Sequence, residues 1–245
     1  MEQTILSAYF IGVACTDKKI IRCSMAVINL DYEYLKNICP TDIDIICRNN
    51  PYNNVVSGPA KSIQKFITSL RNNNIKVKEI CCNIPYHSPY ISSVQTQLLL
   101  KLNKIIPQPK QRSSKWISTS IHRTDWSTSA SKLSSAEYHT NSILSTVLFE
   151  QATHLIQNNA ITIEIGPDSI LQDILNEVLH AEVTNIMLTQ HTRQDTEVIL
   201  RGIGKLYNCG LQPQIANLYP PVEFPVSRGT PMISPLIRYV VLLSL

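Results

Sequence analysis

The residue of this chain best suited to chemistry is His87, which lies in the segment CNIPYHSPY at residues 82–90. The pattern predicts a strand before this segment and a helix after it, so the imidazole stands at the mouth of a turn. A neutral imidazole placed there can act as a general base. A base needs a nucleophile to activate, and no Gly-x-Ser-x-Gly nucleophile elbow occurs in the 245 residues. The chain therefore contains one half of a two-residue catalytic device.

Two serines near this region are poor candidates for the missing half. Ser88 adjoins His87, and neighbouring side chains seldom reach the geometry of a base and its nucleophile. Ser57 lies in a predicted strand of the preceding region. We reject both as nucleophiles.

The remaining histidines and the cysteines show no metal-binding pattern. Five other histidines have no ligand-like spacing, and we expect each to lie at the surface or at a helix end: His122, His139, His154, His180 and His191. Seven cysteines include no C-x-x-C pair, so a zinc site is not expected, and the odd count argues against a disulfide framework. Reduced thiols are typical of a cytoplasmic protein, which is the location we predict.

The composition limits which classes of partner the chain is expected to bind. With 44% hydrophobic and 16% charged residues the chain can bury a core, and its net charge of +4 is too small to indicate nucleic-acid binding. A mild positive excess favours acidic partners and phosphorylated ligands. No apolar stretch reaches membrane-spanning length, so no membrane association is expected. The single G-x-G, at Gly202 and Gly204, lies in a helical pattern and is better explained by helix packing than by a nucleotide.

Two kinds of element order follow one another along the chain. Residues 23–83 read as strand, helix, strand, strand, helix, strand, the ferredoxin-like order, with the helices at 32–38 and 60–72. Later segments alternate between helix and strand, as in a parallel sheet. They are helices at 90–106, 136–157, 169–180 and 192–208, and strands at 116–121, 161–165 and 185–189.

The chain is therefore predicted to be α/β and to have three parts. Residues 1–22 and 84–211 form the main α/β core, and 23–83 form the ferredoxin-like insert. Residues 212–245 are Pro-rich and read as a linker or tail.

Several segments together resemble one family, the malonyl/acetyl transferase domain of animal-type type I fatty acid synthases. The likeness covers about residues 2 to 238. It rests on VSGP at 56–59, VKE at 77–79, YHS at 86–88, KWISTS at 115–120, SSAEY at 134–138, IEIGP at 163–167, and YPPVEFP at 219–225 followed by SRGTPMISPLI at 227–237. The resemblance implies an acyltransferase core with an incomplete parallel sheet, a ferredoxin-like insert and a Pro-rich C-terminal linker.

The resemblance also assigns roles to residues. In the family, a serine on a nucleophile elbow attacks an acyl-CoA thioester and a histidine takes its proton; His87 matches that histidine. Tyr86 stands where the family has the aromatic that lines the acyl pocket, and Ile84 and Ile11 are expected with it at the substrate. The family's A-Y-x-R-G pattern, whose arginine grips the malonyl carboxylate, here reads Ala8-Tyr9-Phe10-Ile11-Gly12.

Two departures from the family limit the expected activity. The chain has no elbow serine, and Ile11 cannot pair with a carboxylate, which would keep its desolvation cost without its bidentate partner. We therefore expect an N-terminally truncated acyltransferase, incomplete as an enzyme, that is inactive alone. Its expected substrates are acyl-CoA and the phosphopantetheine-carrying acyl carrier protein, with no bound cofactor and no metal.

Two other functions remain open. The chain could be a non-catalytic interaction module or a fragment of a larger synthase, binding carrier protein or other fatty acid synthase domains. RNA binding is the weaker alternative, because the predicted third strand, at residues 55–57, lacks the aromatic residues that such sheets use for stacking.

Overall fold

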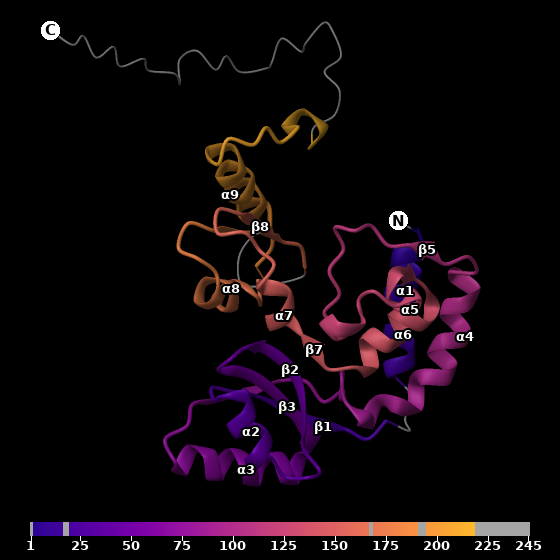
Figure 1. Ribbon diagram of the computed structural model, residues 1–245, viewed down its shortest axis with the longest axis vertical. Coiled ribbons are helices and arrows are strands. Elements are labelled where there is room, and N and C mark those ends of the chain that lie inside the picture. The colour runs from indigo at the N-terminus through magenta and orange to yellow at the C-terminus, as the bar shows by residue number, and fades with distance from the viewer. Residues whose placement is uncertain (1, 17–19, 167–168, 191–194, 219–245) are drawn as a thin grey trace, which may run out of the picture.

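The computed structural model (Figure 1) describes residues 2–16, 20–166, 169–190 and 195–218. Three groups of elements are visible in Figure 1: a sheet with two helices, a set of packed helices, and a βα unit. The Pro-rich stretch predicted at 212–245 lies outside the described residues from 219 onward. Among the described residues, no helix has the length and apolar character needed to cross a membrane.

The first group has the element order predicted for residues 23–83. Its members are β1 (Cys23–Ile28), α2 (Tyr32–Ile38), β2 (Asp44–Asn50), β3 (Asn53–Pro59), α3 (Ala60–Asn72) and β4 (Val77–Ile80). The strands pair antiparallel in the order β4-β1-β3-β2, and β7 (Val147–Leu148) adds a parallel strand beside β2. This sheet is therefore mixed, and β7 connects it to the rest of the chain.

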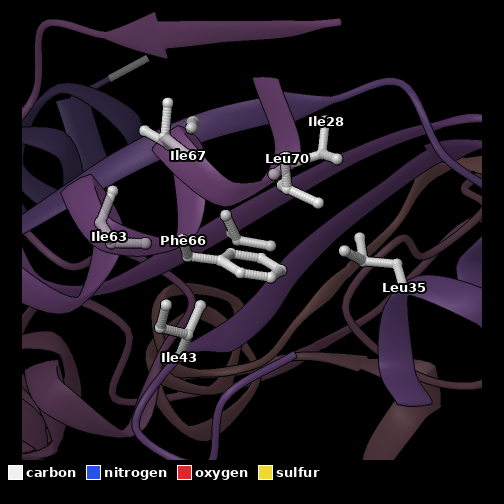
Figure 2. Packing of buried hydrophobic residues seen from close by; sticks show 9 residues of the cluster. Ile28, Leu35, Ile43, Ile63, Phe66, Ile67 and Leu70 are labelled. Atoms are coloured by element: carbon white, nitrogen blue, oxygen red, sulfur yellow. The ribbon is translucent and has the colours of Figure 1, made fainter. Parts of the chain in front are cut away.

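Local sequence explains both helices of this group. The Asp31 side chain accepts a hydrogen bond of 2.9 Å from the backbone N–H of Tyr34, which caps α2. In α3, apolar residues recur at helical spacing and are all buried: Ile63, Phe66, Ile67 and Leu70. Figure 2 shows them packed together with Ile28, Leu35 and Ile43. Full burial of each such side chain stabilises the fold by about 1.5–3 kcal/mol.

The second group is mostly helical and supports the segment that follows β4. It contains α1 (Glu2–Cys15), η1 (Pro89–Val94), α4 (Gln95–Ile105), β5 (Lys110–Gln111), η2 (Arg123–Asp125), α5 (Ser129–Lys132), β6 (Leu133–Ser134) and α6 (Ala136–Leu144). Helices α1 and α6 both pack against α4. Leu98 and Leu102 of α4 form a buried cluster with Ala136 of α6, and the α1 residues that pack against this cluster are Phe10, Ile11 and Ala14.

The third group is a parallel βα unit. It comprises α7 (Phe149–Thr153), β8 (Ile161–Glu164), α8 (Gln172–Val178), β9 (Thr184–Met187), α9 (Asp195–Asn208) and η3 (Ile215–Leu218). Strands β8 and β9 pair in parallel, as the alternating pattern predicts. Gly202 lets α9 approach β9, since a Cβ there would lie 2.8 Å from the Met187 carbonyl oxygen. Gly210, with φ of 82°, ends the helix as predicted.

Two predicted elements of the second half are wrong. The helix predicted over 136–157 is broken, because Ser145 is extended and the chain then pairs as β7 before α7 begins. Residues 116–121 are not a strand. There the backbone N–H of Trp116 turns back to the Ser113 carbonyl oxygen, and the Ser118 and Ser120 hydroxyls lie 3.4 Å apart.

Candidate functional site

The backbone of His87 is held in an uncommon conformation. Its φ is 63°, in the left-handed region that residues with a Cβ seldom adopt. The His87 N–H donates to the carbonyl oxygen of Ile143, near the end of α6, at 2.8 Å. A hydrogen bond between segments distant in sequence therefore offsets the backbone strain, which is an arrangement found at functional sites.

The imidazole is oriented by a second contact with the same region. Nδ1 lies 3.1 Å from the carbonyl oxygen of Ser145. Because a carbonyl oxygen can only accept, Nδ1 must donate, so the neutral ring carries its proton on Nδ1. The Nε2 lone pair then remains available to accept a proton. This is the tautomer that a general base requires.

Burial keeps this imidazole neutral. Desolvation lowers the pKa of His87 below its ordinary value, and it outweighs the opposing effect of the backbone carbonyls of Ser145 and Ser142. A ring that is neutral at physiological pH can accept a proton. The orientation of the His87 ring and its lowered pKa therefore both suit a general base.

Neither nearby serine is positioned as its nucleophile. The buried Ser88 hydroxyl donates to the Pro85 carbonyl oxygen at 2.8 Å, so its proton is directed away from the imidazole. Ser57 is fully buried in β3. The rejection of both residues as nucleophiles agrees with these positions.

The three predicted substrate-binding residues lie together. Ile11, Ile84 and Tyr86 all pack against one buried cluster, whose members are Cys15, Ile20, Ile91 and Val94. Tyr86 packs on this cluster and also lies next to the histidine: its ring centroid is 6.3 Å from that of His87, and its hydroxyl bonds the Cys15 thiol. Burial first, and then this bond, raise the pKa of Tyr86 to about 12, so the hydroxyl stays protonated.

Two cavities are lined by residues that contact this region, and His87 itself lines neither of them. Ile11 lines one of about 410 Å³ together with Trp116 and His139. Ser145, whose carbonyl holds the His87 ring, lines another of about 670 Å³ together with Asn141. Cavities of this size are of the order that small acyl groups and cofactor fragments occupy.

His139 is a polar residue whose surroundings the sequence did not indicate. The expectation that it lies at the surface or at a helix end holds only in part: it is in the first turn of α6, but it is half-buried and its Nε2 lies 2.9 Å from the Ser134 hydroxyl. Burial and the nearby Arg112 guanidinium lower its pKa. Arg112 stacks on two aromatic rings, with its Cζ 4.5 Å from the centroid of Tyr138 and 5.2 Å from that of Trp116.

In the described part of the chain, no group of three or more His, Cys, Asp or Glu residues is placed to hold a metal ion. The region contains an oriented neutral imidazole, the apolar cluster on which Tyr86 and Ile84 pack, and the two cavities described above. Such a site can accept and return a proton next to an apolar group.

Comparison with known proteins extends this description. A model of the acyl transferase domain family matches residues 2–209. The chain is 25% identical over 230 residues to squalestatin hexaketide synthase clz14 of Cochliobolus lunatus, covering 88% of this chain and 9% of that protein. It is 27% identical over 141 residues to polyketide synthase GfsB of Streptomyces halstedii, covering 57% and 2%. The chain thus spans less than a tenth of either relative.

Solved structures show the same fold. A loading acyltransferase from the avermectin modular polyketide synthase matches with a TM-score of 0.68 at 17% identity, over 84% of this chain and 65% of that one. The acyltransferase domain from module 8 of the salinomycin polyketide synthase matches with a TM-score of 0.72 at 14% identity, over 86% and 50%. The fold is therefore that of an α/β acyltransferase.

The relatives named here are polyketide synthases, so these matches do not confirm the finer likeness to animal fatty acid synthase. The family match covers most of the chain, including the histidine segment and the helix that carries Ile11. This chain belongs to the acyl transferase domain family.

Proposed function

We propose that this chain supplies the general base and part of the acyl-binding surface of an acyltransferase. The reaction moves an acyl group from coenzyme A to the phosphopantetheine thiol of an acyl carrier protein, within a fatty acid or polyketide synthase. One observation carries the proposal: the carbonyls of Ile143 and Ser145 hold His87 with Nδ1 as the donor, so that Nε2 carries the lone pair of the neutral ring. The family match and the polyketide synthase relatives support it.

The imidazole would act twice in such a reaction. Nε2 takes the proton of a serine hydroxyl while the serine oxygen attacks the thioester carbonyl carbon. As the C–S bond breaks, Nε2 returns that proton to the departing coenzyme A thiolate. In the second half, Nε2 takes the proton of the carrier thiol, which attacks the acyl ester, and gives it to the serine oxygen as the C–O bond breaks.

The polypeptide of 245 residues, expressed by itself, is proposed to be inactive in this transfer. It contains no Gly-x-Ser-x-Gly segment, and the buried Ser88 hydroxyl is bonded to a carbonyl. Without the elbow serine of the family, the base lacks the alcohol whose proton it would accept. Incubation with acetyl-CoA followed by mass spectrometry should show no acyl adduct that depends on His87.

Ile11 is proposed to select against malonyl groups. It packs among apolar side chains and lines the cavity of about 410 Å³, so a carboxylate beside it would lose water without the bidentate guanidinium partner that the family's arginine supplies. Lys110 lines the same cavity, but an ammonium group is a point charge and does not replace that fork. A neutral acyl group such as acetyl meets no such penalty. The preference should therefore be acetyl over malonyl.

A graft tests both proposals. A Gly-His-Ser-x-Gly segment is joined in frame before residue 2, and loading from acetyl-CoA and malonyl-CoA is compared. We expect acetyl loading that His87→Ala abolishes and that a matched control at the exposed His180, His180→Ala, retains. Ile11→Arg should shift loading toward malonyl. Loading that survives His87→Ala would refute the assignment of the base, and a malonyl preference with Ile11 present would refute the role of Ile11.

A non-catalytic interaction module is the second candidate, and surface charge favours it. Three exposed lysines follow one another along α4 and the segment after it, namely Lys104, Lys110 and Lys115. An acidic carrier protein would be attracted to them. Pull-down with carrier protein should succeed for the native chain and weaken in a triple Lys→Glu variant. Equal capture of both would refute this docking surface.

We also infer the domain division and the location. Residues 23–83 form a ferredoxin-like subdomain, supported by the order β4-β1-β3-β2, and they are inserted between the core segments 1–22 and 84–211, with 212–245 as linker. Limited proteolysis should cut near residues 22 and 84, and cuts within α3 instead would contradict the division.

Seven unpaired thiols support a cytoplasmic location, because thiols stay reduced in that compartment.

A further inference from the structure

The carbonyl that orients His87 is itself held by a side-chain amide. The Ser145 hydroxyl donates to Asn141 Oδ1 at 2.8 Å, and Asn141 Nδ2 donates to the Ser120 carbonyl oxygen at 3.2 Å. Together with the bond from His87 Nδ1 to the Ser145 carbonyl, these contacts make a continuous chain of hydrogen bonds from His87 to Ser120. Asn141 is its central member.

This chain of bonds lies where α6 ends. Ser145 is the C-cap, with an extended backbone at φ −92° and ψ 150°, and its N–H bonds the Asn141 carbonyl at 2.8 Å. Asn141 therefore contacts Ser145 through both its backbone and its side chain. The direction in which the Ser145 carbonyl points depends on these two contacts, because the residue no longer belongs to the helix.

At its Ser120 end, this series of hydrogen bonds is anchored by the segment before η2. The Thr119 carbonyl, next to Ser120, accepts from the Leu148 N–H at 2.6 Å. Ser120 itself is only 8% exposed. The Asn141 amide thus joins a fixed buried segment to the residue that holds the imidazole, which is how supporting hydrogen bonds orient a catalytic group.

We propose that Asn141 is the positioning residue of His87, joining Ser145 to Ser120 so that the Ser145 carbonyl faces Nδ1. This inference deepens the proposed function, because the role of the imidazole as base rests on that proposal. The alternative is that Asn141 only caps α6. A cap stabilises the helix without setting which ring nitrogen of His87 carries the proton.

The test reads the His87 ring directly in the native 245-residue chain. Long-range ¹H–¹⁵N NMR reports the tautomer and the pKa of each histidine. We expect native His87 to show the Nδ1–H form. In Asn141→Ala both tautomers should appear, and the pKa of His87 should move toward its ordinary value as the ring loses its fixed, dry position.

Two further variants separate positioning from capping. Asn141→Asp keeps the acceptor for the Ser145 hydroxyl but opposes the Ser120 carbonyl with a negative oxygen, so it should disturb His87 as Asn141→Ala does. Ser145→Ala keeps the carbonyl and loses only the hydroxyl. Ser145→Ala should also populate both tautomers of His87. The double variant Asn141→Ala/Ser145→Ala should change the tautomer ratio little more than either single variant does, because the two residues act in one network.

Asn176 provides the matched control. Its side chain accepts from Asn185 Nδ2 at 2.7 Å within the βα unit, away from His87. Asn176→Ala should leave the His87 signals unchanged. The proposal is overturned if Asn141→Ala and Asn141→Asp both retain the native tautomer, or if Asn176→Ala shifts His87 equally. Circular dichroism of each variant checks the fold, and Ser145→Ala provides the reading if the Asn141 variants do not fold.

Activity gives a second, separable readout. In the chain with a grafted elbow, Asn141→Ala should lower acetyl loading by about 10- to 100-fold, since a base misplaced by about 1 Å loses rates of this order. The KM for acetyl-CoA should change little. If His87 is oriented by Asn141 but the grafted chain never loads, the proposed function fails while this inference stands. If the grafted chain loads acetyl and the tautomer of His87 is the same with and without Asn141, the proposed function stands and this inference fails.

Discussion

The left-handed backbone of His87 leads to a stability prediction whose sign is unusual. At φ of 63° a residue with a Cβ carries a strain of roughly 1–2 kcal/mol, which glycine does not. Glycine in turn loses about 0.5–1 kcal/mol to the greater entropy of its unfolded state. The difference leaves His87→Gly more stable than His87→Ala by about 0.5–1 kcal/mol. Both variants lose the bond from Nδ1 to the Ser145 carbonyl, so that loss cancels between them.

A helical position supplies the matched comparison. Ser69 is exposed in the interior of α3, where alanine is favoured over glycine by about 1 kcal/mol. His87→Gly should therefore be more stable than His87→Ala, whereas Ser69→Gly should be less stable than Ser69→Ala. The predicted gap between the two sites is about 1.5–2 kcal/mol, the sum of the effects above.

Urea unfolding followed by circular dichroism measures this gap. A difference of about 1 kcal/mol moves the midpoint by roughly 0.5 M when the m-value is about 2 kcal/mol/M. Equal m-values among the four variants would show that only stability has changed. If His87→Ala proves as stable as His87→Gly or more so, the left-handed strain at this residue, and the argument that its hydrogen bonds offset it, are refuted.

Three other predictions concern stability. Since the pKa values of His87 and His139 are lowered from 6.5, the unfolded chain binds protons that the folded chain does not as the pH falls below 6.5. The urea midpoint should therefore fall from pH 7.5 to 5.5, and it should fall less when both histidines are replaced by glutamine; an equal fall would contradict this. Gly202→Ala should destabilise by about 1–3 kcal/mol, because its Cβ would meet atoms at 2.8 Å, whereas Gly204→Ala, with open space, should stabilise by up to about 1 kcal/mol in thermal melts. Ile67→Ala empties a fully buried position and should cost about 2–5 kcal/mol in urea unfolding; a loss below about 1 kcal/mol would mean that the α3 core is not packed as Figure 2 shows.

Local sequence was enough to predict the elements whose signals lie within a few residues. Helix α3 runs from Ala60 to Asn72, as its apolar spacing and the asparagines after it predict, and Asp31 caps α2. Strands β1 to β4 follow in the expected order, although their ends differ by a few residues. The choice of His87 also needed only the sequence, because the residues around it match a known family segment.

The support of the imidazole could not be predicted in this way. The long helix expected over 136–157 breaks at Ser145 because Val147 pairs with Cys47, a partner 100 residues away that no local pattern reveals. That break is what turns the Ser145 carbonyl toward His87. Likewise, the Trp116 ring and the Arg112 guanidinium reach His139 only through the fold, because neither lies near it in the sequence.

By itself, the sequence determined helices α2 and α3, the order of the strands along residues 23–83, the candidate base and the absence of an elbow serine among its 245 residues. These follow from spacing, capping and segment likeness, which act over short stretches of chain. Only the tertiary structure decided which nitrogen of His87 carries the proton and what holds the ring. Those depend on the carbonyl of Ser145 and the amide of Asn141, brought to the imidazole by pairing between distant segments.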